Sequence, residues 1–416
     1  MADSTKNSLA MENASDRRPS SFLGDGSIAQ MIGFLTLTIR KHAETQSAFY
    51  LMKCYDSVGS DGQSELPRGD REKGVEKNGS QERKTSPVFV VGCHRSGTNL
   101  LYDTLLSAGG FAIYRGYLPI YKMLIPRFGG LDVPQSRKRI IEIWLRSKGF
   151  RRSGLDASLL SAKLDASRNG GDFMRIVMDE IATLQNSTRW AVYDPDNVLY
   201  MPRIKTDIPR ALFVHILRDG RDIALSLRKM GGFTPLFWNR KPRGLCETAL
   251  YWEWMVRRGR EYGSAIPADY IEVRYEDLVS EPRRTLAKLG EFLAHDLDYD
   301  RIQSSSLGTL RESNSSFRLE EKKEASPLNR WKESLSKEEV ASIEAVVGDC
   351  LEASGYVLET PREERKPGLQ ERWLRTIYPG FLDAKFWFKI KTPIGRLVNT
   401  SALELAGPGS QPESMA

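Results

Sequence analysis

The sequence has 416 residues, a formal net charge of +7, and four cysteines with no C-x-x-C pair among them. Neither a disulfide framework nor a zinc site is indicated, and the four histidines show no metal-ligand spacing either, so we expect no metal. The positive charge suits anionic ligands, but no recognisable nucleic-acid-binding module accompanies it, so we expect no nucleic-acid partner.

Residues 1–86 are expected to be largely disordered, with one short helical segment. Residues 1–28 and 56–86 are rich in Ser, Gly, Asp, Lys and Glu and have few apolar side chains to bury. Between them, SIAQMIGFLTLTIRK (27–41) contains an apolar run that is too short to span a bilayer, and the polar start of the chain does not resemble a signal peptide. We therefore expect a cytoplasmic protein.

The stretch PVFVVGCHRSGTNLLYDTLLSAGG (87–110) predicts a strand, a glycine loop and a helix in that order. Its first five residues form a β-branched and aromatic run typical of a buried parallel strand, and Leu101, Leu105 and Ala108 fall on one helical face. This geometry directs backbone N–H groups and the positive end of a helix dipole at the loop. An anion is therefore the expected occupant.

The loop departs from the nucleotide-binding motif G-x-x-x-x-G-K-[ST]. Gly92 and Gly97 keep the spacing, but Thr98 and Asn99 follow where Lys and Ser or Thr would bind a nucleotide's phosphates with Mg²⁺. Arg95 supplies a full positive charge inside the loop, and a guanidinium can bind a tetrahedral oxyanion through two hydrogen bonds. The substitution argues against ATP, while a loop that serves packing alone stays open as an alternative.

A second strand-loop-helix unit follows in PRALFVHILRDGRDIALSLRK (209–229). Its strand, ALFVHIL, is continuously apolar and places Arg218 at the carboxyl end, where ligands bind in open α/β sheets. The next helix carries Ser226. Arg218 and Ser226 can together bind a second anion, although pairing of Arg218 with Asp219 or Asp222 is the structural alternative.

The two motifs, in this order, resemble those of the sulfotransferases that use 3'-phosphoadenosine 5'-phosphosulfate (PAPS). In that family a G-x-x-R-S-G-T loop holds the 5'-phosphosulfate, and an R-x-x-R-D-x-x-x-S segment holds the 3'-phosphate. The matching residues are Gly92, Arg95, Ser96, Gly97 and Thr98 in the first motif, with Asn99 next to it, and Arg218, Asp219, Arg221, Asp222 and Ser226 in the second. The resemblance implies PAPS as co-substrate and no metal.

Strands and helices alternate from residue 87 to about 358, which is the signature of a doubly wound parallel sheet. The resemblance continues through DYIEVRYEDLVSEP (269–282), where a strand is expected to run into Tyr275–Leu278. It implies a P-loop-type three-layer α/β/α fold over residues 87–360, flanked by mobile tails. The family branch implied is the Arg-loop branch, which includes protein-tyrosine sulfotransferases and is related to carbohydrate sulfotransferases.

The loop ESNSSFRLEEKKEASPLNRW (312–331) resembles the family segment that closes over PAPS. By this resemblance Ser315, Ser316, Arg330 and Trp331 are candidate contacts to the co-substrate. For Trp331, a packing role at the start of the next helix is an equal alternative.

The acceptor side departs from the branch pattern. A glutamate base commonly follows the first helix there, whereas AIYRGYLPIYKML (112–124) has no carboxylate, and Tyr193 stands where the branch has Lys before D-P. Asp194 is the candidate general base, with capping of the next turn as its alternative. His94 can donate a hydrogen bond to the transferred group or orient the loop, and Glu253 is a weaker candidate for the base.

Residues 361–416 form a basic and aromatic C-terminal tail. The composition of residues 361–398 suits an interfacial membrane segment or a partner surface, and an arm packed back on the domain is an equal alternative. Membrane contact would make the protein membrane-peripheral and would point to a lipid-linked acceptor.

The leading hypothesis is a PAPS-dependent sulfotransferase that moves a sulfuryl group to a hydroxyl or amine of a small-molecule, carbohydrate, lipid-linked or peptide acceptor. Arg95 and the loop N–H groups would stabilise charge on the bridging and leaving oxygens. A P-loop nucleotide kinase or NTPase is the alternative, disfavoured by the missing Lys. A non-catalytic nucleotide-binding protein on the same scaffold is the third hypothesis.

Overall fold

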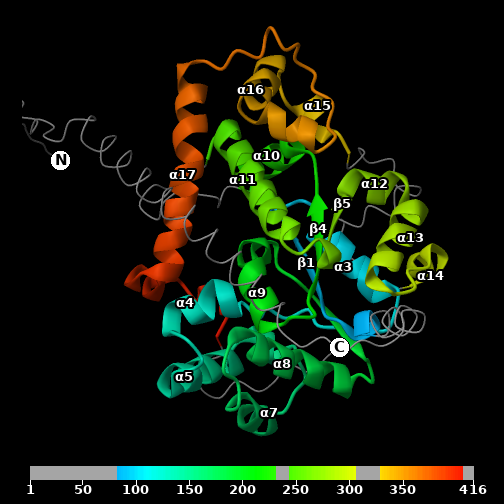
Figure 1. Ribbon diagram of the computed structural model, residues 1–416, viewed down its shortest axis with the longest axis vertical. Helices are drawn as coiled ribbons and strands as arrows, with labels where there is room; N and C mark the ends of the chain where they lie inside the picture. The colour runs from blue at the N-terminus through cyan, green and yellow to red at the C-terminus, as the bar shows by residue number, and fades with distance from the viewer. Residues whose placement is uncertain (1–81, 231–242, 306–327, 406–416) are drawn as a thin grey trace, which may run out of the picture.

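The computed structural model describes residues 82–230, 243–305 and 328–405, which are drawn in colour in Figure 1. The predicted N-terminal helical segment and the candidate contacts Ser315 and Ser316 lie outside these ranges.

Five parallel strands form one sheet in the order β2-β3-β1-β4-β5. They are β1 (Val88–Gly92), β2 (Phe111–Ala112), β3 (Arg189–Tyr193), β4 (Leu212–Leu217) and β5 (Tyr270–Arg274). The central strand β1 pairs with β3 on one side and with β4 on the other. The carboxyl ends of all three strands therefore lie at one edge of the sheet, and the loops that follow them are neighbours.

Helices occupy most of the remaining described chain. They are α3 (Thr98–Ser107), α4 (Ile125–Phe128), α5 (Pro134–Leu145), α6 (Lys148–Arg151), α7 (Ala157–Leu164), α8 (Gly170–Leu184), α9 (Met201–Asp207), α10 (Gly220–Lys229), α11 (Leu245–Ser264), α12 (Tyr275–Ser280), α13 (Pro282–Leu293), α14 (Tyr299–Ser304), α15 (Arg330–Ser334), α16 (Lys337–Ala353) and α17 (Leu369–Lys391). Shorter helical turns are η1 (Ile120–Leu124), η2 (Pro195–Tyr200), η3 (Pro267–Asp269), η5 (Pro393–Leu397) and η6 (Ser401–Leu403).

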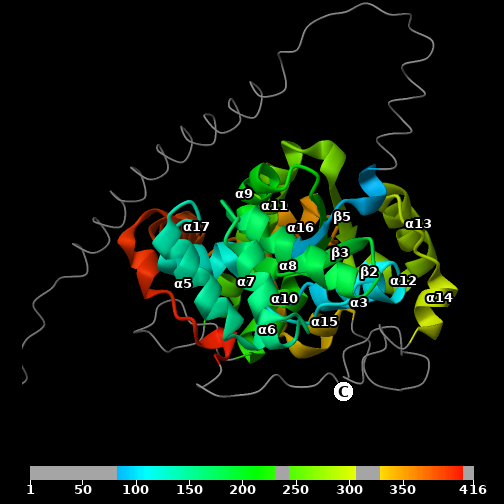
Figure 2. The same ribbon diagram turned by 90° about the horizontal axis from the view of Figure 1, so that it is seen from below.

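Alternate residues of β1 pack into two separate cores, one on each face of the sheet. Val88 and Val90 join a core with leucines of α3 and α13, whereas Phe89 and Val91 join one with α8, α10 and α11. Both views of the molecule place α13 and α14 on one side and α11 and α17 on the other (Figures 1 and 2). The predicted three-layer α/β/α fold with a parallel sheet is confirmed.

The end of β5 differs from the expectation. The strand stops at Arg274, and Tyr275–Ser280 form the short helix α12. Glu276 and Asp277 lie in its first turn, where carboxylates favour a helix N-terminus. Glu276 Oε1 also accepts a hydrogen bond from the backbone N–H of Asp219 at 3.0 Å. The helical turn therefore fastens β5 to the loop after β4.

The C-terminal tail, as far as residue 405, is not the mobile tail expected with the fold; it is the packed arm that the sequence leaves open as the alternative. Leu374, Tyr378 and Leu382 of α17 are buried, and the helix packs on α11 and α16. Figure 1 shows it as a long red helix along one side of the molecule. None of the helices in the described ranges has both the length and the apolar character needed to cross a membrane.

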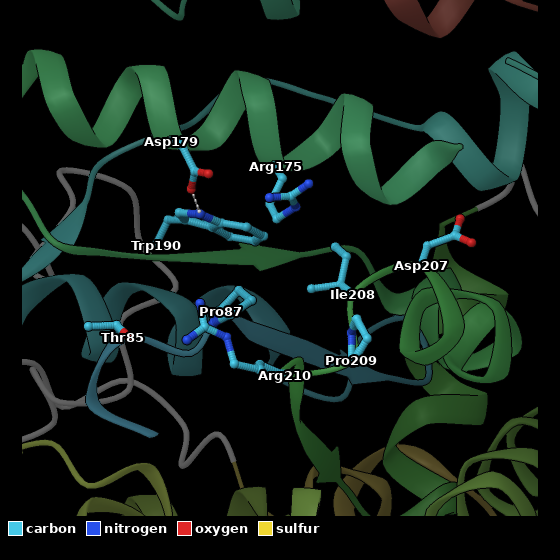
Figure 3. A pocket seen from close by; sticks show the side chains of 9 residues that line it. All are labelled: Thr85, Pro87, Arg175, Asp179, Trp190, Asp207, Ile208, Pro209 and Arg210. Atoms are coloured by element: carbon cyan, nitrogen blue, oxygen red, sulfur yellow. Dashed lines mark hydrogen bonds between the residues drawn. The ribbon is translucent and has the colours of Figure 1, made fainter. Parts of the chain in front are cut away.

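A cavity of about 280 Å³ opens at the amino-terminal edge of the sheet. Its lining includes Pro87, directly before β1, and Pro209 and Arg210, before β4 (Figure 3). Trp190 donates its indole N–H to Asp179 of α8 at 2.7 Å beside it. The cavity therefore lies at the end of the strands opposite to the glycine loop.

Replacing Gly92 with Ala is expected to lower the free energy of unfolding by about 1–3 kcal/mol, because backbone strain and close contact combine there. Gly92 has φ +154°, and an added Cβ would lie 2.5 Å from the carbonyl oxygen of Ile216, a backbone atom of β4. The measurement is urea denaturation. Gly109→Ala is the control, since Gly109 also has positive φ but no atom within 4 Å of a Cβ. Equal losses in both variants would contradict the contact with β4 as the cause.

Candidate functional site

The glycine loop, residues 93–97, joins β1 to α3 at the carboxyl edge of the sheet. The buried Ser96 hydroxyl donates to the carbonyl of Cys93 at 2.7 Å, which closes the loop on itself. Gly97 has φ +102°, and an added Cβ would lie 2.5 Å from the ring of Tyr275. Among the described side chains none caps the start of α3. Its first N–H groups are therefore directed at the loop, as anion binding requires.

The residues of the first turn of α3 differ in exposure. Thr98 is buried, whereas Asn99 and the loop residue Arg95 are exposed. Arg95 adopts φ 72°, a left-handed conformation that is uncommon for a non-glycine residue. This conformation turns the Arg95 side chain toward α10.

The second predicted anion segment meets the first. Arg95 Nε donates to Ser226 Oγ of α10 at 3.0 Å, and Arg218 Nη1 donates to the carbonyl of Arg95 at 3.3 Å. The Arg218 guanidinium also lies 4.4 Å from the centre of the Tyr275 ring and 3.5 Å from Asp222 Oδ2. The structural alternative, pairing with Asp222, is thus present together with the contact to the loop.

Trp331 has a packing role in the structure. Its side chain is 3% exposed, and the Cζ atom of the Arg221 guanidinium lies 3.8 Å from the centre of the indole ring. Its backbone N–H donates to Asp222 Oδ1 at 2.9 Å, which ties α15 to α10. The sequence allows two interpretations of Trp331, contact with the co-substrate and packing at the start of a helix. This environment matches the packing interpretation. Arg330, at the start of α15, is exposed.

A cluster of charged side chains lies beside the loop on the β3 side. Lys122 Nζ of η1 pairs with Asp196 and lies 4.0 Å from Asp194 Oδ1. His94 Nδ1 lies 3.7 Å from Asp196 Oδ1, and the Tyr251 hydroxyl lies 3.3 Å from the same nitrogen. Asp194 Oδ1 accepts the backbone N–H of Asp196 at 3.0 Å, so the capping role predicted as its alternative is present.

The two carboxylates of this cluster differ in proton affinity. Burial raises the pKa of Asp194, and repulsion from Asp196 adds to the rise, while Lys122 opposes it. Burial also acts to raise the pKa of Asp196, but His94 and Lys122 outweigh it and lower that pKa to about 2. Asp196 is therefore the fixed negative charge of the cluster, and Asp194 is the carboxyl that accepts a proton more readily.

Three residues of this cluster were not candidates from the sequence: Lys122, Asp196 and Lys389. Lys389 of α17 lies near both carboxylates; burial lowers its pKa, and attraction to Asp196 opposes this. Lys122 belongs to residues 112–124, the segment that lacks the glutamate expected after the first helix. The missing carboxylate is the one signal in the sequence that the acceptor side differs there. Glu253 is paired with Arg257 of its own helix.

The family model of the sulfotransferase family matches residues 87–301, more than half of the chain. The chain belongs to the sulfotransferase family. The match covers the glycine loop, the Arg218–Ser226 segment and both carboxylates of the charged cluster. Among curated proteins no match is found.

Several solved sulfotransferase structures are similar to this chain, with low sequence identity. The sulfotransferase domain from the curacin biosynthetic pathway is 15% identical over 65% of this chain and 98% of that one, with a TM-score of 0.43. The domain from the Synechococcus PCC 7002 olefin synthase is 18% identical over 65% and 95%, with a TM-score of 0.40. Sulfotransferase STF9 from Mycobacterium avium is 14% identical over 69% and 82%, with a TM-score of 0.36.

Proposed function

We propose that this sulfotransferase takes its sulfuryl group from PAPS and transfers it to an acceptor hydroxyl or amine next to His94. The observation that carries the proposal is the meeting of the two segments that are predicted to bind anions: Arg95 contacts Ser226, and Arg218 contacts the backbone of Arg95. A donor with a phosphosulfate at one end and a 3'-phosphate at the other suits two adjacent sites of this kind.

The loop residues are assigned to the phosphosulfate. The uncapped N-terminus of α3 and the Arg95 guanidinium supply donors for the charge that develops on the bridging oxygen as the S–O bond breaks. Gly97 is required because a side chain there would fill the space between the loop and Tyr275. Arg218 and Ser226 are assigned to the 3'-phosphate, through charge-assisted hydrogen bonds.

The charged cluster is assigned to the acceptor. His94 takes the acceptor proton while the new bond to sulfur forms and the bond from sulfur to the bridging oxygen breaks, so the electron pair leaves with the bisphosphate product. Asp196 lies at ion-pair distance from His94 Nδ1 and stabilises the imidazolium that results. Asp194 is the alternative base, although its carboxylate already caps η2.

The kinase hypothesis has less support, because the loop offers Thr98 and Asn99 where a kinase needs Lys and a metal-binding hydroxyl. We expect the bisphosphate product, 3',5'-bisphosphorylated adenosine, to raise the melting temperature of the protein with EDTA present. At 100 times its Kd a ligand that binds only the folded state stabilises it by about 2.7 kcal/mol. ATP with Mg²⁺ at the same concentration should stabilise much less. The measurement is a set of melting curves with and without chelator.

The control for this experiment is Arg218→Ala. It should reduce the shift caused by the bisphosphate and leave the smaller shift caused by adenosine 5'-phosphosulfate, because only the former has a 3'-phosphate. A larger shift with Mg-ATP, abolished by EDTA, would replace the PAPS proposal with the kinase hypothesis. Equal losses for both adenosine ligands would show that Arg218 is scaffold.

A further inference from the structure

The outer side of the C-terminal segment carries large apolar side chains that the fold does not bury. Trp387 and Ile390 of α17 are each 37% exposed, and Ile394 and Leu397 of η5 are 52% and 77% exposed. We call these four residues the C-terminal apolar face. Exposed apolar groups gathered in this way mark interaction surfaces rather than core.

The four residues come from two consecutive helical elements. Trp387 and Ile390 are three residues apart on α17, the spacing that aligns side chains along one side of a helix. Ile394 and Leu397 belong to η5, which follows α17 after Thr392. On the inner side of α17, Leu382 is buried, and the Phe386 ring packs against Tyr200 with 5.4 Å between the ring centres. The helix is thus fastened by its inner side, which leaves its outer side exposed.

The charges around this face are of one sign. Residues 384–403 contain Lys385, Lys389, Lys391 and Arg396 and no Asp or Glu. Lys391 and Arg396 are exposed beside the apolar face. The nearest carboxylates along the chain are engaged elsewhere: Asp383 binds Trp254 and Arg258, and Glu404 binds Lys148. The face therefore combines tryptophan and aliphatic groups with the exposed positive charges of Lys391 and Arg396.

We propose that the C-terminal apolar face docks on an anionic lipid surface, with α17 lying in the plane of the interface. Tryptophan beside aliphatic side chains and flanking lysine and arginine is the composition of in-plane membrane helices. A protein partner with the same fit would need an acidic apolar surface, whereas an anionic bilayer supplies both features. The proposal does not depend on the identity of the sulfuryl donor.

Docking there would place the charged cluster close to the lipid. Lys389 directly precedes Ile390 in α17 and is near Asp196 and Lys122 on the inner side of the helix. The backbone of η5 at Gly395 packs closely on α4, since an added Cβ at Gly395 would lie 2.9 Å from the carbonyl oxygen of Pro126. The segment of α17 and η5 that would contact the lipid thus also contacts the charged cluster and α4.

The test is co-sedimentation of the full chain with phosphatidylcholine vesicles that contain or lack phosphatidylserine. We expect binding to the phosphatidylserine vesicles that weakens with added salt. The pair Trp387→Glu and Ile394→Glu should lower this binding by ~10-fold or more. Lys391→Glu and Arg396→Glu should each lower it by about fivefold or more, since losing one basic residue at such a surface costs about fivefold and the new carboxylate adds repulsion.

Matched controls lie on other sides of the molecule. Leu184→Glu changes an exposed leucine at the end of α8, and Lys288→Glu reverses an exposed charge on α13, which both views place opposite α17 (Figures 1 and 2). Both should bind vesicles as the unchanged chain does. Absence of binding to the phosphatidylserine vesicles, or equal losses in the controls, would overturn the proposal. If Trp387→Glu instead dissociates an oligomer in light scattering, the face binds a second copy of the chain.

Discussion

Replacing Arg95 with Ala is expected to slow sulfuryl transfer by ~10² to 10³ fold, the usual effect of removing one donor that stabilises a developing oxyanion. Arg95 is exposed inside the glycine loop, and its contact to Ser226 places it between the two anion segments. The rate is measured as label transferred from radiolabelled PAPS into an extract of candidate acceptors. Near-unchanged turnover would remove Arg95 from the reaction.

The unusual backbone of Arg95 calls for a second variant. Because its φ is 72°, residues with a Cβ, alanine included, are strained at this position, whereas asparagine tolerates the conformation better. Arg95→Asn should lose as much activity as Arg95→Ala. Arg283→Ala serves as the control for loss of an arginine. Arg283 lies on α13 and forms an exposed ion pair with Asp300 of α14. Recovery of activity in Arg95→Asn alone would assign the loss to backbone strain.

The parts of the site that the sequence could predict are those built from contiguous residues. The loop after β1 and the segment after β4 each consist of a strand, a turn and a helix, and local patterns determine all three. The sequence does not state that the two strands are neighbours; the pairing of β1 with β4 brings their carboxyl ends together, and Arg95 contacts Ser226 there. The fold class follows from the same alternation.

The charged cluster could not be predicted, because its members come from separate parts of the chain. Lys122 lies on η1, Asp196 on η2 and Lys389 on α17, and no local pattern states that these three turns meet. Their meeting depends on how η1, η2 and α17 pack on one another. The sequence gives only a weak cue, the missing glutamate near Lys122, which indicates a change in the acceptor side without showing what replaces it.

Tertiary packing also decides the conformation at Tyr275 and Trp331. Tyr275 continues a strand-like pattern, yet its ring lies against Gly97, and Glu276 after it binds the backbone N–H of Asp219, so the chain turns into a helix. Trp331 follows a segment that resembles a co-substrate closure, yet its ring is enclosed by Arg221, which itself pairs with Asp219 and Glu344. In each case a partner distant in sequence determines the conformation.

Replacing His94 with Gln is expected to lower kcat by ~10² to 10⁴ fold, the range for loss of a general base. The measurement is kcat for label transfer from radiolabelled PAPS. KM for PAPS should stay unchanged, because His94 faces Asp196 and Tyr251 rather than the Arg218 segment. His295→Gln is the matched control, because His295 binds the carbonyl of Gly109 at 2.9 Å, away from the cluster.

Two further variants separate His94 from Asp194 as the base. Asp196 stays ionised down to a pH of about 2, so Asp196→Asn removes a fixed charge that stabilises the imidazolium. It should lower kcat less than His94→Gln and leave KM for PAPS unchanged, because Asp196 faces Lys122 and His94 rather than the Arg218 segment. Asp194→Asn keeps an oxygen that can cap η2 and should cost less again. If Asp194→Asn instead abolishes turnover while His94→Gln retains it, the proton goes to the carboxyl whose pKa burial raises, and His94 only orients the loop.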